Sequence, residues 1–155
     1  MLHLESPAHI GAISDTHGEL DPRALEALAE TDLIVHAGDI GGQHILLALE
    51  AVAPVVAVRG NTDHAPWAFD LPDTALFTVG PLRALVVHSV GGLRVPKGVG
   101  LVISGHTHRP LVESRGGVLC VNPGSATEPR TQGRARSVAL ISVGAGVAQA
   151  RVVTL

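Results

Sequence analysis

The chain has 155 residues, of which 46% are hydrophobic and 2% aromatic, and its 11 basic and 14 acidic residues give a formal net charge of −3. This length predicts one domain, residues 1–155, with a single core, and the scattered basic residues and rare aromatics argue against a dedicated nucleic-acid-binding module. Since no uncharged apolar run reaches 18 residues and residues 1–10 lack a basic, hydrophobic leader, we expect no membrane span, no signal peptide and a cytoplasmic protein.

The first half of the chain alternates predicted strands and helices. Nearly continuous apolar runs, which a parallel sheet covered on both faces requires, predict strands at residues 9–14, 33–37 and 55–58. Asp21 and Pro22 form the start signal of a short helix that runs to about Glu30, and the apolar spacing over Gly42 to Val52 predicts a second helix. This βαβαβ order implies a parallel sheet with right-handed crossovers.

The second half predicts β-structure joined by short turns. Apolar runs predict hairpins whose strands lie at residues 74–79 and 82–88, 111–114 and 117–121, and 137–143 and 148–154, with a further strand at 99–103. The glycine-rich residues 91–98 have room for at most one helical turn. In the loop over residues 65–73, Trp67 and Phe69 are expected to be apolar plugs. Cys120 is expected to be a small buried hydrophobe in a reducing compartment.

Side chains that can bind metal ions stand where several apolar runs end. They are Asp15, His17, Asp39, Asn61, His88, His106 and His108. Open α/β sheets keep their ligands at the carboxyl ends of the strands. Side chains two residues apart on an extended backbone emerge on one face, as we expect for Asp15 with His17 and for His106 with His108. For the last pair alone, a solvated loop that contains two histidines is the alternative.

The mixture of carboxylates and imidazoles favours a transition metal, because Ca²⁺ and Mg²⁺ prefer oxygen ligands alone. The seven candidate ligands exceed the needs of one ion. We therefore expect two ions that share a bridging carboxylate, an arrangement in which the ions lie about 3.5 to 4 Å apart and bind both oxygens of a phosphoryl displacement.

Five blocks carry a resemblance to a known family. They are Asp15-x-His17, Gly38-Asp39, Gly60-Asn61-x-Asp63, His88 and Gly105-His106-x-His108, and Asn122-Pro123-Gly124-Ser125 follows them. In this order, over about residues 9–126, the blocks resemble the calcineurin-like metallophosphoesterases, above all their small single-domain phosphodiesterase branch. The resemblance implies a four-layer α/β/β/α sandwich of two mixed sheets flanked by helices. It also implies hydrolysis of phosphate esters with two divalent ions, Mn²⁺ first and Zn²⁺, Fe²⁺, Ni²⁺ or Co²⁺ as alternatives.

The resemblance also implies a role for each candidate ligand. Asp15, His17 and His108 would hold the first ion, Asn61, His88 and His106 would hold the second, and Asp39 would bridge both. A hydroxide bridging the two ions would attack phosphorus in line, with Asn61 helping to neutralise the developing charge. The implied catalytic residues are Asp39, Asn61 and His88.

The chain departs from the family pattern at three places. Many relatives have a histidine, an expected leaving-group acid, where this chain has Thr62. We therefore expect esters with good leaving groups, such as aryl esters, to react best; His64 is a substitute acid or an exposed loop histidine. Ser89-Val90 follow His88 where relatives usually have Gly-His, which bears on how His88 fits. The helix before the last histidine block is shortened to residues 91–98, which opens one flank of the site or provides a surface for a partner.

Other polar residues have simpler interpretations. Asp63 is expected to orient the Asn61 loop through hydrogen bonds, and Ser14 and Ser125 are interpreted as turn formers. Solvated or hydrogen-bonded histidines are expected at His3, His9, His36 and His44. Candidates for phosphate contact, or else ordinary solvated arginines, are Arg59, Arg109 and Arg130.

The sequence thus predicts a dinuclear phosphoesterase for a small phosphate ester, a phosphodiesterase before a phosphomonoesterase. A non-catalytic metal-binding scaffold, like the retromer scaffold subunit that is similar to this fold, is the first alternative. A nuclease is the second. A homo-oligomer could form through the hairpin at residues 137–154.

Overall fold

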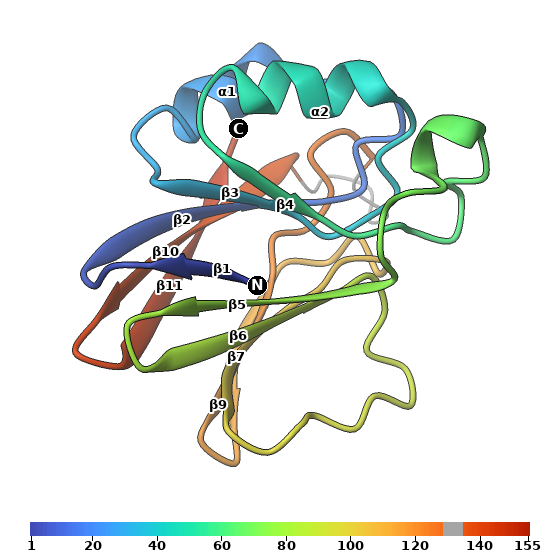
Figure 1. Ribbon diagram of the computed structural model, residues 1–155. Coiled ribbons are helices and arrows are strands. Elements are labelled where there is room, and N and C mark those ends of the chain that lie inside the picture. Colours follow the sequence, from blue (N-terminus) through green and yellow to red (C-terminus); the bar gives the residue numbers. More distant parts are fainter. Residues whose placement is uncertain (129–134) are drawn as a thin grey trace.

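The computed structural model describes residues 1–128 and 135–155 and consists of two mixed β-sheets packed face to face, with helices over one of them (Figure 1). One sheet has the order β11-β10-β2-β3-β4. Its strands are β2 (Ala8–Ile13), β3 (Leu33–His36), β4 (Val55–Ala57), β10 (Ser137–Gly144) and β11 (Val147–Thr154). In this sheet β2, β3 and β4 are parallel, and β10 is antiparallel to both β2 and β11. The predicted βαβαβ opening is therefore confirmed.

The second sheet has six strands in the order β1-β5-β6-β7-β9-β8. They are β1 (Leu2–Leu4), β5 (Thr74–Val79), β6 (Leu82–Val87), β7 (Val99–Ile103), β8 (Leu111–Arg115) and β9 (Val118–Asn122). The adjacent strands β6, β7 and β9 are parallel to one another. All three predicted hairpins form, as β5–β6, β8–β9 and β10–β11. The short β1 was not predicted; it gains its place by parallel pairing with β5.

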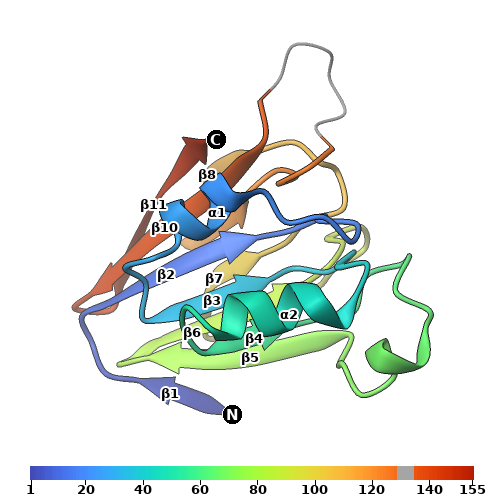
Figure 2. The same cartoon turned by 90° about the horizontal axis from the view of Figure 1, so that it is seen from above.

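Two helices cover the outer face of the five-stranded sheet. Figure 2 shows α1 (Pro22–Ala27) over the side of β2 and β10 and α2 (Gln43–Glu50) over β3 and β4. The Asp21 carboxylate caps α1 by accepting the Arg23 N–H, as its position before Pro22 predicts. The helix ends at Ala27, three residues before the predicted end near Glu30. Both helices seal an apolar layer whose fully buried members include Ile13, Leu28, Ile34 and Leu49.

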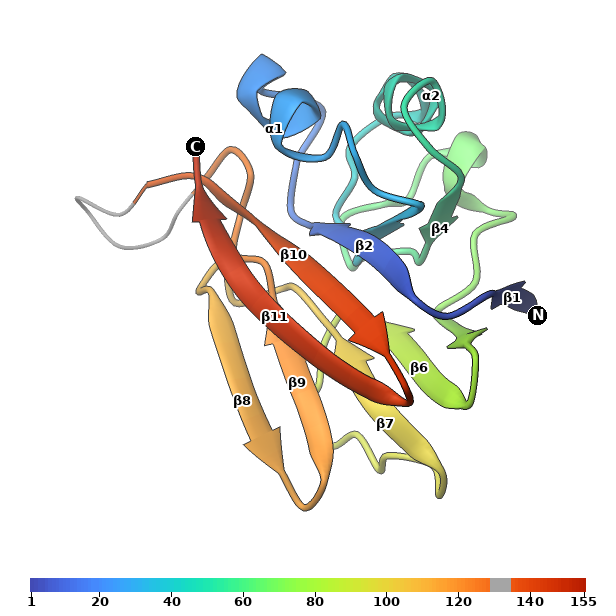
Figure 3. The same ribbon diagram turned by 90° about the vertical axis from the view of Figure 1, so that its left-hand side faces the viewer.

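The main core lies between the two sheets; Figure 3 shows β2 and β10 of one sheet above β6, β7 and β9 of the other. Side chains of alternate strand residues fill it, among them Ile10, Val35, Phe77 and Leu101, each without exposed surface. Burial of each such side chain stabilises the fold by about 1.5 to 3 kcal/mol before entropy is counted. This layer fixes the distance between the sheets and therefore the distance between the loops at their common end.

The outer face of the six-stranded sheet is covered differently. Leu93, from the connection between β6 and β7, packs on a small apolar cluster that includes Leu85 and Val102. The described connection between β6 and β7 contains turns and no helix. This agrees with the prediction that residues 91–98 have room for at most one helical turn. The two mixed sheets and one helical layer of the expected sandwich are therefore present, and this irregular connection stands in place of the other helical layer.

Two side-chain predictions were wrong. Phe69 is 63% exposed, so it does not plug the loop. Trp67, in the 3₁₀ turn Pro66–Ala68, is half-buried and packs against the apolar layer that the two helices cover. Cys120 is also only half-buried. It lies on the outer face of the six-stranded sheet rather than in the main core.

Neither α1 nor α2, nor any other helix within residues 1–128 and 135–155, is long and apolar enough to cross a membrane. The β11 strand forms one edge of its sheet. Pairing of two copies along this edge stays a prediction.

Candidate metal centre

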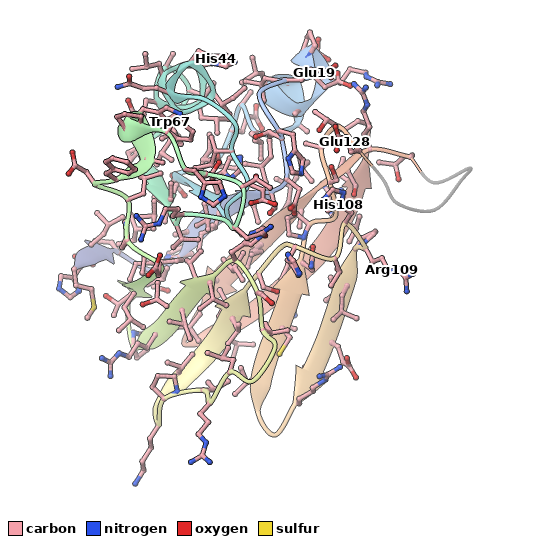
Figure 4. All side chains as sticks on the ribbon, turned by 90° about the vertical axis from the view of Figure 1, so that its right-hand side faces the viewer. Glu19, His44, Trp67, His108, Arg109 and Glu128 are labelled. Atoms are coloured by element: carbon pink, nitrogen blue, oxygen red, sulfur yellow. The ribbon has the colours of Figure 1, made fainter. Side chains whose placement is uncertain are left out.

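All seven predicted ligands lie at one end of the two-sheet sandwich. Asp15 and His17 follow β2, Asp39 follows β3 and Asn61 follows β4, all from the five-stranded sheet. From the six-stranded sheet, His88 follows β6, and His106 and His108 follow β7. Figure 4 shows His108 at the junction of the two sheets and Arg109 at the periphery. The ligands converge because parallel strands of both sheets end at the same side.

Three of these residues form what we call the first cluster: Asp15, His17 and His108. The Nε2 atoms of His17 and His108 are 3.3 Å apart, and Nε2 of His108 is 3.3 Å from Oδ1 of Asp15. One ligand atom from each residue can be chosen so that all lie within 4.8 Å of one another. Asp15 and His108 are buried, and His17 is partly exposed. This geometry is that of a candidate metal-binding cluster.

Three others form the second cluster: Asn61, His88 and His106. Oδ1 of Asn61 is 2.8 Å from Nε2 of His88 and 3.1 Å from Nδ1 of His106. Asp39 lies between the two clusters, since its Oδ2 is 3.3 Å from Nε2 of His88 and 3.9 Å from Nε2 of His17. Asp15, Asp39 and His88 form a second group whose ligand atoms all lie within 4.8 Å.

Hydrogen bonds on the far side of two rings fix their tautomers. Nδ1 of His88 donates to the carbonyl oxygen of Ala37 at 2.7 Å, and Nδ1 of His108 donates to that of Glu128. In a neutral ring, donation from Nδ1 leaves a lone pair at Nε2, and both Nε2 atoms face the carboxylates. Metal-binding histidines are held in this way, with the second nitrogen donating to a carbonyl.

The Asp15 carboxylate also fits a cation. Its Oδ2 accepts the Ser14 hydroxyl at 2.7 Å and the His106 N–H at 3.0 Å. Its Oδ1 is the one buried side-chain polar atom without a hydrogen-bond partner in the described chain. A buried, unpartnered carboxylate oxygen beside a histidine lone pair is costly unless a positive ion lies between them. The donor set therefore fits a metal ion.

The backbone at the ligands corrects one sequence-based argument. Asp15, His17, Asp39, His106 and His108 have φ values between 48° and 71°, the left-handed region, and do not extend their strands. Alternation along an extended strand is therefore not what brings the two pairs together. Each such residue costs about 1 to 2 kcal/mol, and backbone bonds between neighbouring loops offset that cost: Asp15 N–H donates to Gly38 O and His17 N–H to Asp39 O, both at 3.0 Å.

Two glycines allow these loops to approach one another. A Cβ atom at Gly60 would overlap the backbone nitrogen and Oδ1 of Asp39. A Cβ atom at Gly105 would overlap the Ser14 hydroxyl and come within 2.7 Å of Asp15 Oδ2. Any side chain at either position would displace a carboxylate that belongs to the site.

The pKa values of the site carboxylates move in opposite directions. Burial raises the pKa of Asp15, and its hydrogen bond with Ser14 only partly offsets this. Burial acts on Asp39 too, but hydrogen bonds from His88 and from the Thr62 N–H, at 2.9 Å, hold its pKa well below the usual range. Burial would lower the pKa of His88, but its contacts with Asp39 and with the Ala37 carbonyl outweigh burial and raise it, because both favour the form of the ring that is protonated at Nδ1 and Nε2. A metal ion at Nε2 would take the place of that second proton. Asp39 is thus ionised at neutral pH.

His36 is a supporting residue that sequence reasoning treated as ordinary. It is fully buried, and Gly38 N–H lies 3.2 Å from its Nδ1. Nε2–H therefore donates to the Thr16 hydroxyl at 2.9 Å, which in turn donates to the Ile40 carbonyl at 2.8 Å. Burial lowers the pKa of His36 to about 3, so the ring is neutral. The only signal in the sequence was a histidine inside an apolar run, three residues before Asp39.

Asp63 orients the Asn61 loop, as predicted. Its carboxylate accepts the N–H groups of Ile40, Gly41 and Gly60 at 2.9 to 3.1 Å. Ser14 and Ser125 do more than form turns, because their hydroxyls bond Asp15 directly.

The arginines give little support for a phosphate contact. Arg59 is engaged by Asp73 at 2.7 Å, Arg109 is exposed, and Arg130 lies outside the described residues. His64 is exposed as well. A cavity of about 690 Å³ lies between α1 and the β10–β11 hairpin, with Glu30 and Arg151 among its lining residues, and it shares none of them with the candidate metal centre.

Two sheets packed face to face, with carboxylate and imidazole clusters where their parallel strands end, define the class of two-sheet metal-dependent phosphoesterases. Residues 9–146 match the calcineurin-like phosphoesterase superfamily domain, and the chain belongs to this superfamily. The resemblance found in the five sequence blocks is thereby confirmed.

Three comparisons place the chain among its relatives. It is 35% identical over 136 residues, 78% of each chain, to a protein of Methanothermobacter thermautotrophicus named "Probable metallophosphoesterase". It is 27% identical to the phosphodiesterase MJ0936 of Methanocaldococcus jannaschii, over 74% of this chain and 82% of the relative. The crystal structure of Chaetomium thermophilum Vps29 superimposes with a TM-score of 0.74 at 21% identity, over 96% of this chain and 95% of the other, a likeness of fold alone.

Proposed function

We propose that the chain is a hydrolase of phosphate esters that uses two divalent ions and prefers diesters to monoesters. The observation that carries the proposal is the position of Asp39, whose Oδ2 faces Nε2 of His17 in one cluster and Nε2 of His88 in the other. A carboxylate oxygen that faces an imidazole nitrogen of each cluster has the position that a shared metal ligand requires.

The assignment of ligands follows the two clusters. Asp15, His17 and His108 would hold one ion, the second cluster would hold the other, and Asp39 would contact both. Nitrogen and oxygen donors in this mixture suit Mn²⁺, which we propose first, and also Zn²⁺, Fe²⁺, Ni²⁺ and Co²⁺.

Two divalent ions held here would polarise the phosphoryl oxygens and make water nucleophilic near neutral pH. The protein supplies the balance of charge: Asp15 and Asp39 contribute two negative charges against the four positive ones, which leaves a centre that attracts phosphate anions. Since Oδ1 of Asn61 faces His88 and His106, its amide N–H groups are left to donate to a substrate oxygen.

The leaving group determines which esters react well. Thr62 and His64 are both exposed, and a threonine hydroxyl cannot protonate a leaving oxygen at neutral pH. We therefore propose aryl and similarly activated esters as good substrates. The preference for diesters draws support from the relative named phosphodiesterase MJ0936.

The test is a comparison of bis-aryl and mono-aryl phosphates with the metal-free chain and after addition of Mn²⁺. We expect turnover only with metal and faster turnover of the diester. A faster monoester would contradict the diester preference. No turnover above that of buffer with Mn²⁺ would instead support the non-catalytic scaffold.

A further inference from the structure

One turn, residues 125–128, makes hydrogen bonds to the backbone of Asp15 and to the ring of His108, two ligands of the first cluster. It follows β9 and packs under the loop that carries Asp15 and His17. Its backbone is held by Ser125, whose hydroxyl accepts the N–H groups of Thr127 at 3.2 Å and Glu128 at 2.7 Å. The same hydroxyl donates to the carbonyl oxygen of Asp15 at 2.8 Å.

Thr127 connects this turn to the backbone between Asp15 and His17. Its buried hydroxyl lies 3.1 Å from the carbonyl oxygen of Asp15 and 3.0 Å from that of Thr16, so a single O–H group is shared between two successive carbonyls. These peptide units connect Asp15 to His17, both of which have left-handed backbone angles. This backbone conformation is unfavourable for residues other than glycine, so bonds to the two carbonyls stabilise it. The Asp15 carbonyl also accepts the Ser125 hydroxyl and the Thr16 carbonyl also accepts the Glu19 N–H at 3.1 Å, but the Thr127 hydroxyl is the donor that contacts both.

The other end of the turn reaches the third ligand. The carbonyl oxygen of Glu128 accepts Nδ1–H of His108 and so fixes the ring with Nε2 toward Asp15. The second cluster is supported elsewhere, by the Ala37 carbonyl behind His88 and by Asp63 behind the Asn61 loop. The Thr127 and Glu128 contacts go to ligands of the first cluster, and the two clusters meet at Asp39 and at the bond from the His106 N–H to Oδ2 of Asp15.

We infer that Thr127 is a positioning residue for the first cluster, whose hydroxyl affects the affinity of that cluster for its ion far more than the affinity of the second cluster. This inference rests on the proposed dinuclear function. Loss of an outer partner of a metal ligand costs about 10 to 100-fold in metal affinity. We expect that loss at one of the two ions only.

The experiment is a calorimetric titration of the metal-free full chain with Mn²⁺. Thr127→Val removes the hydroxyl at nearly constant volume, Thr127→Ala does so without a branched side chain, and Thr127→Ser restores the donor. Thr31→Val is the matched control, because the Thr31 hydroxyl also donates to a carbonyl, that of Leu28 at 2.9 Å, away from the metal centre. His17→Ala identifies the binding event of the first cluster.

We expect two binding events in the unaltered chain, in Thr127→Ser and in Thr31→Val. In Thr127→Val and Thr127→Ala, the event that His17→Ala removes should weaken at least about 10-fold, and the other should change less than about 2-fold. Two unchanged events in both variants, or equal weakening of both events, would overturn the inference and leave the proposed function intact. Fewer than two events in the unaltered chain would overturn both.

Discussion

The Nε2 atoms of His17 and His108 face each other at 3.3 Å, although the proton of His108 is committed to Nδ1 by its bond to the Glu128 carbonyl. The Nε2 lone pair of His108 also faces the unpartnered Oδ1 of Asp15 at 3.3 Å, so that a lone pair lies against a carboxylate oxygen. A positive ion removes that conflict. The predictions below test this account of the site.

Replacement of the shared carboxylate should remove both ions. Asp39→Asn keeps the shape of the side chain and an oxygen for the Thr62 N–H, but it removes the negative charge that faces both clusters. We expect metal affinity to fall by more than the roughly 100-fold that loss of an outer partner costs, and turnover to fall with it. Atomic absorption after dialysis measures the metal. Glu113→Gln, an equal change of charge on the exposed strand β8, should behave as the unaltered chain; full metal content in Asp39→Asn would contradict the assignment.

A histidine in place of Thr62 should change which esters react. The unaltered chain should hydrolyse aryl esters much faster than alkyl esters, because Thr62 supplies no acid. Thr62→His places an imidazole, which can protonate a leaving oxygen, beside Asn61. General acid catalysis contributes about 100 to 10,000-fold where it acts, so we expect the rate with alkyl esters to rise at least 10-fold relative to aryl esters. Equal rates for both ester types in the unaltered chain would reveal a different acid.

His36 should make the fold less stable in mild acid. Its pKa in the fold is about 3, against 6.5 for an unperturbed histidine. The unfolded chain therefore binds the extra proton first, and the stability from the neutral ring is complete above pH 6.5 and is lost as the pH falls toward 3. Between pH 7 and pH 5 the free energy of unfolding should fall by about 2 kcal/mol from this residue alone.

His36→Gln isolates that contribution, because glutamine can still donate to Thr16 and does not titrate. Urea unfolding of the metal-free chain at both pH values should show a loss about 2 kcal/mol smaller in His36→Gln than in the unaltered chain. Identical losses would mean that the ring is charged in the fold.

Asp63 should stabilise the fold through the loop that carries Asn61. Asp63→Asn replaces an acceptor of the N–H groups of Ile40, Gly41 and Gly60 with an amide whose nitrogen cannot accept. Bonds to charged groups are each worth about 1.5 to 3 kcal/mol, so we expect a loss of at least about 2 kcal/mol in unfolding free energy. A stability unchanged in urea would show that Asp63 does not hold this loop.

The sequence predicted most of the fold and the convergence of the candidate ligands, because both depend on strong local patterns. Apolar runs with turn residues between them located ten of the eleven strands in residues 1–128 and 135–155. The exception was β1, whose three residues, Leu2–Leu4, depend on pairing with β5. The candidate ligands stood out because each follows a buried strand.

What the sequence did not predict depends on tertiary contacts. The left-handed backbone at Asp15 and His17 is imposed by bonds to the neighbouring Gly38 and Asp39 loops. The support from His36 and Thr127 joins residues that are far apart in the chain, and a buried histidine or threonine carries no pattern that marks such a contact.

The most direct test of the central claim is anomalous diffraction from crystals soaked in Mn²⁺, recorded at the manganese absorption edge. The account predicts two peaks between the clusters, one beside Asp15, His17 and His108 and one beside Asn61, His88 and His106, with Asp39 in contact with both. No peak at this end of the sandwich, or a single peak that Asp39 does not touch, would contradict it.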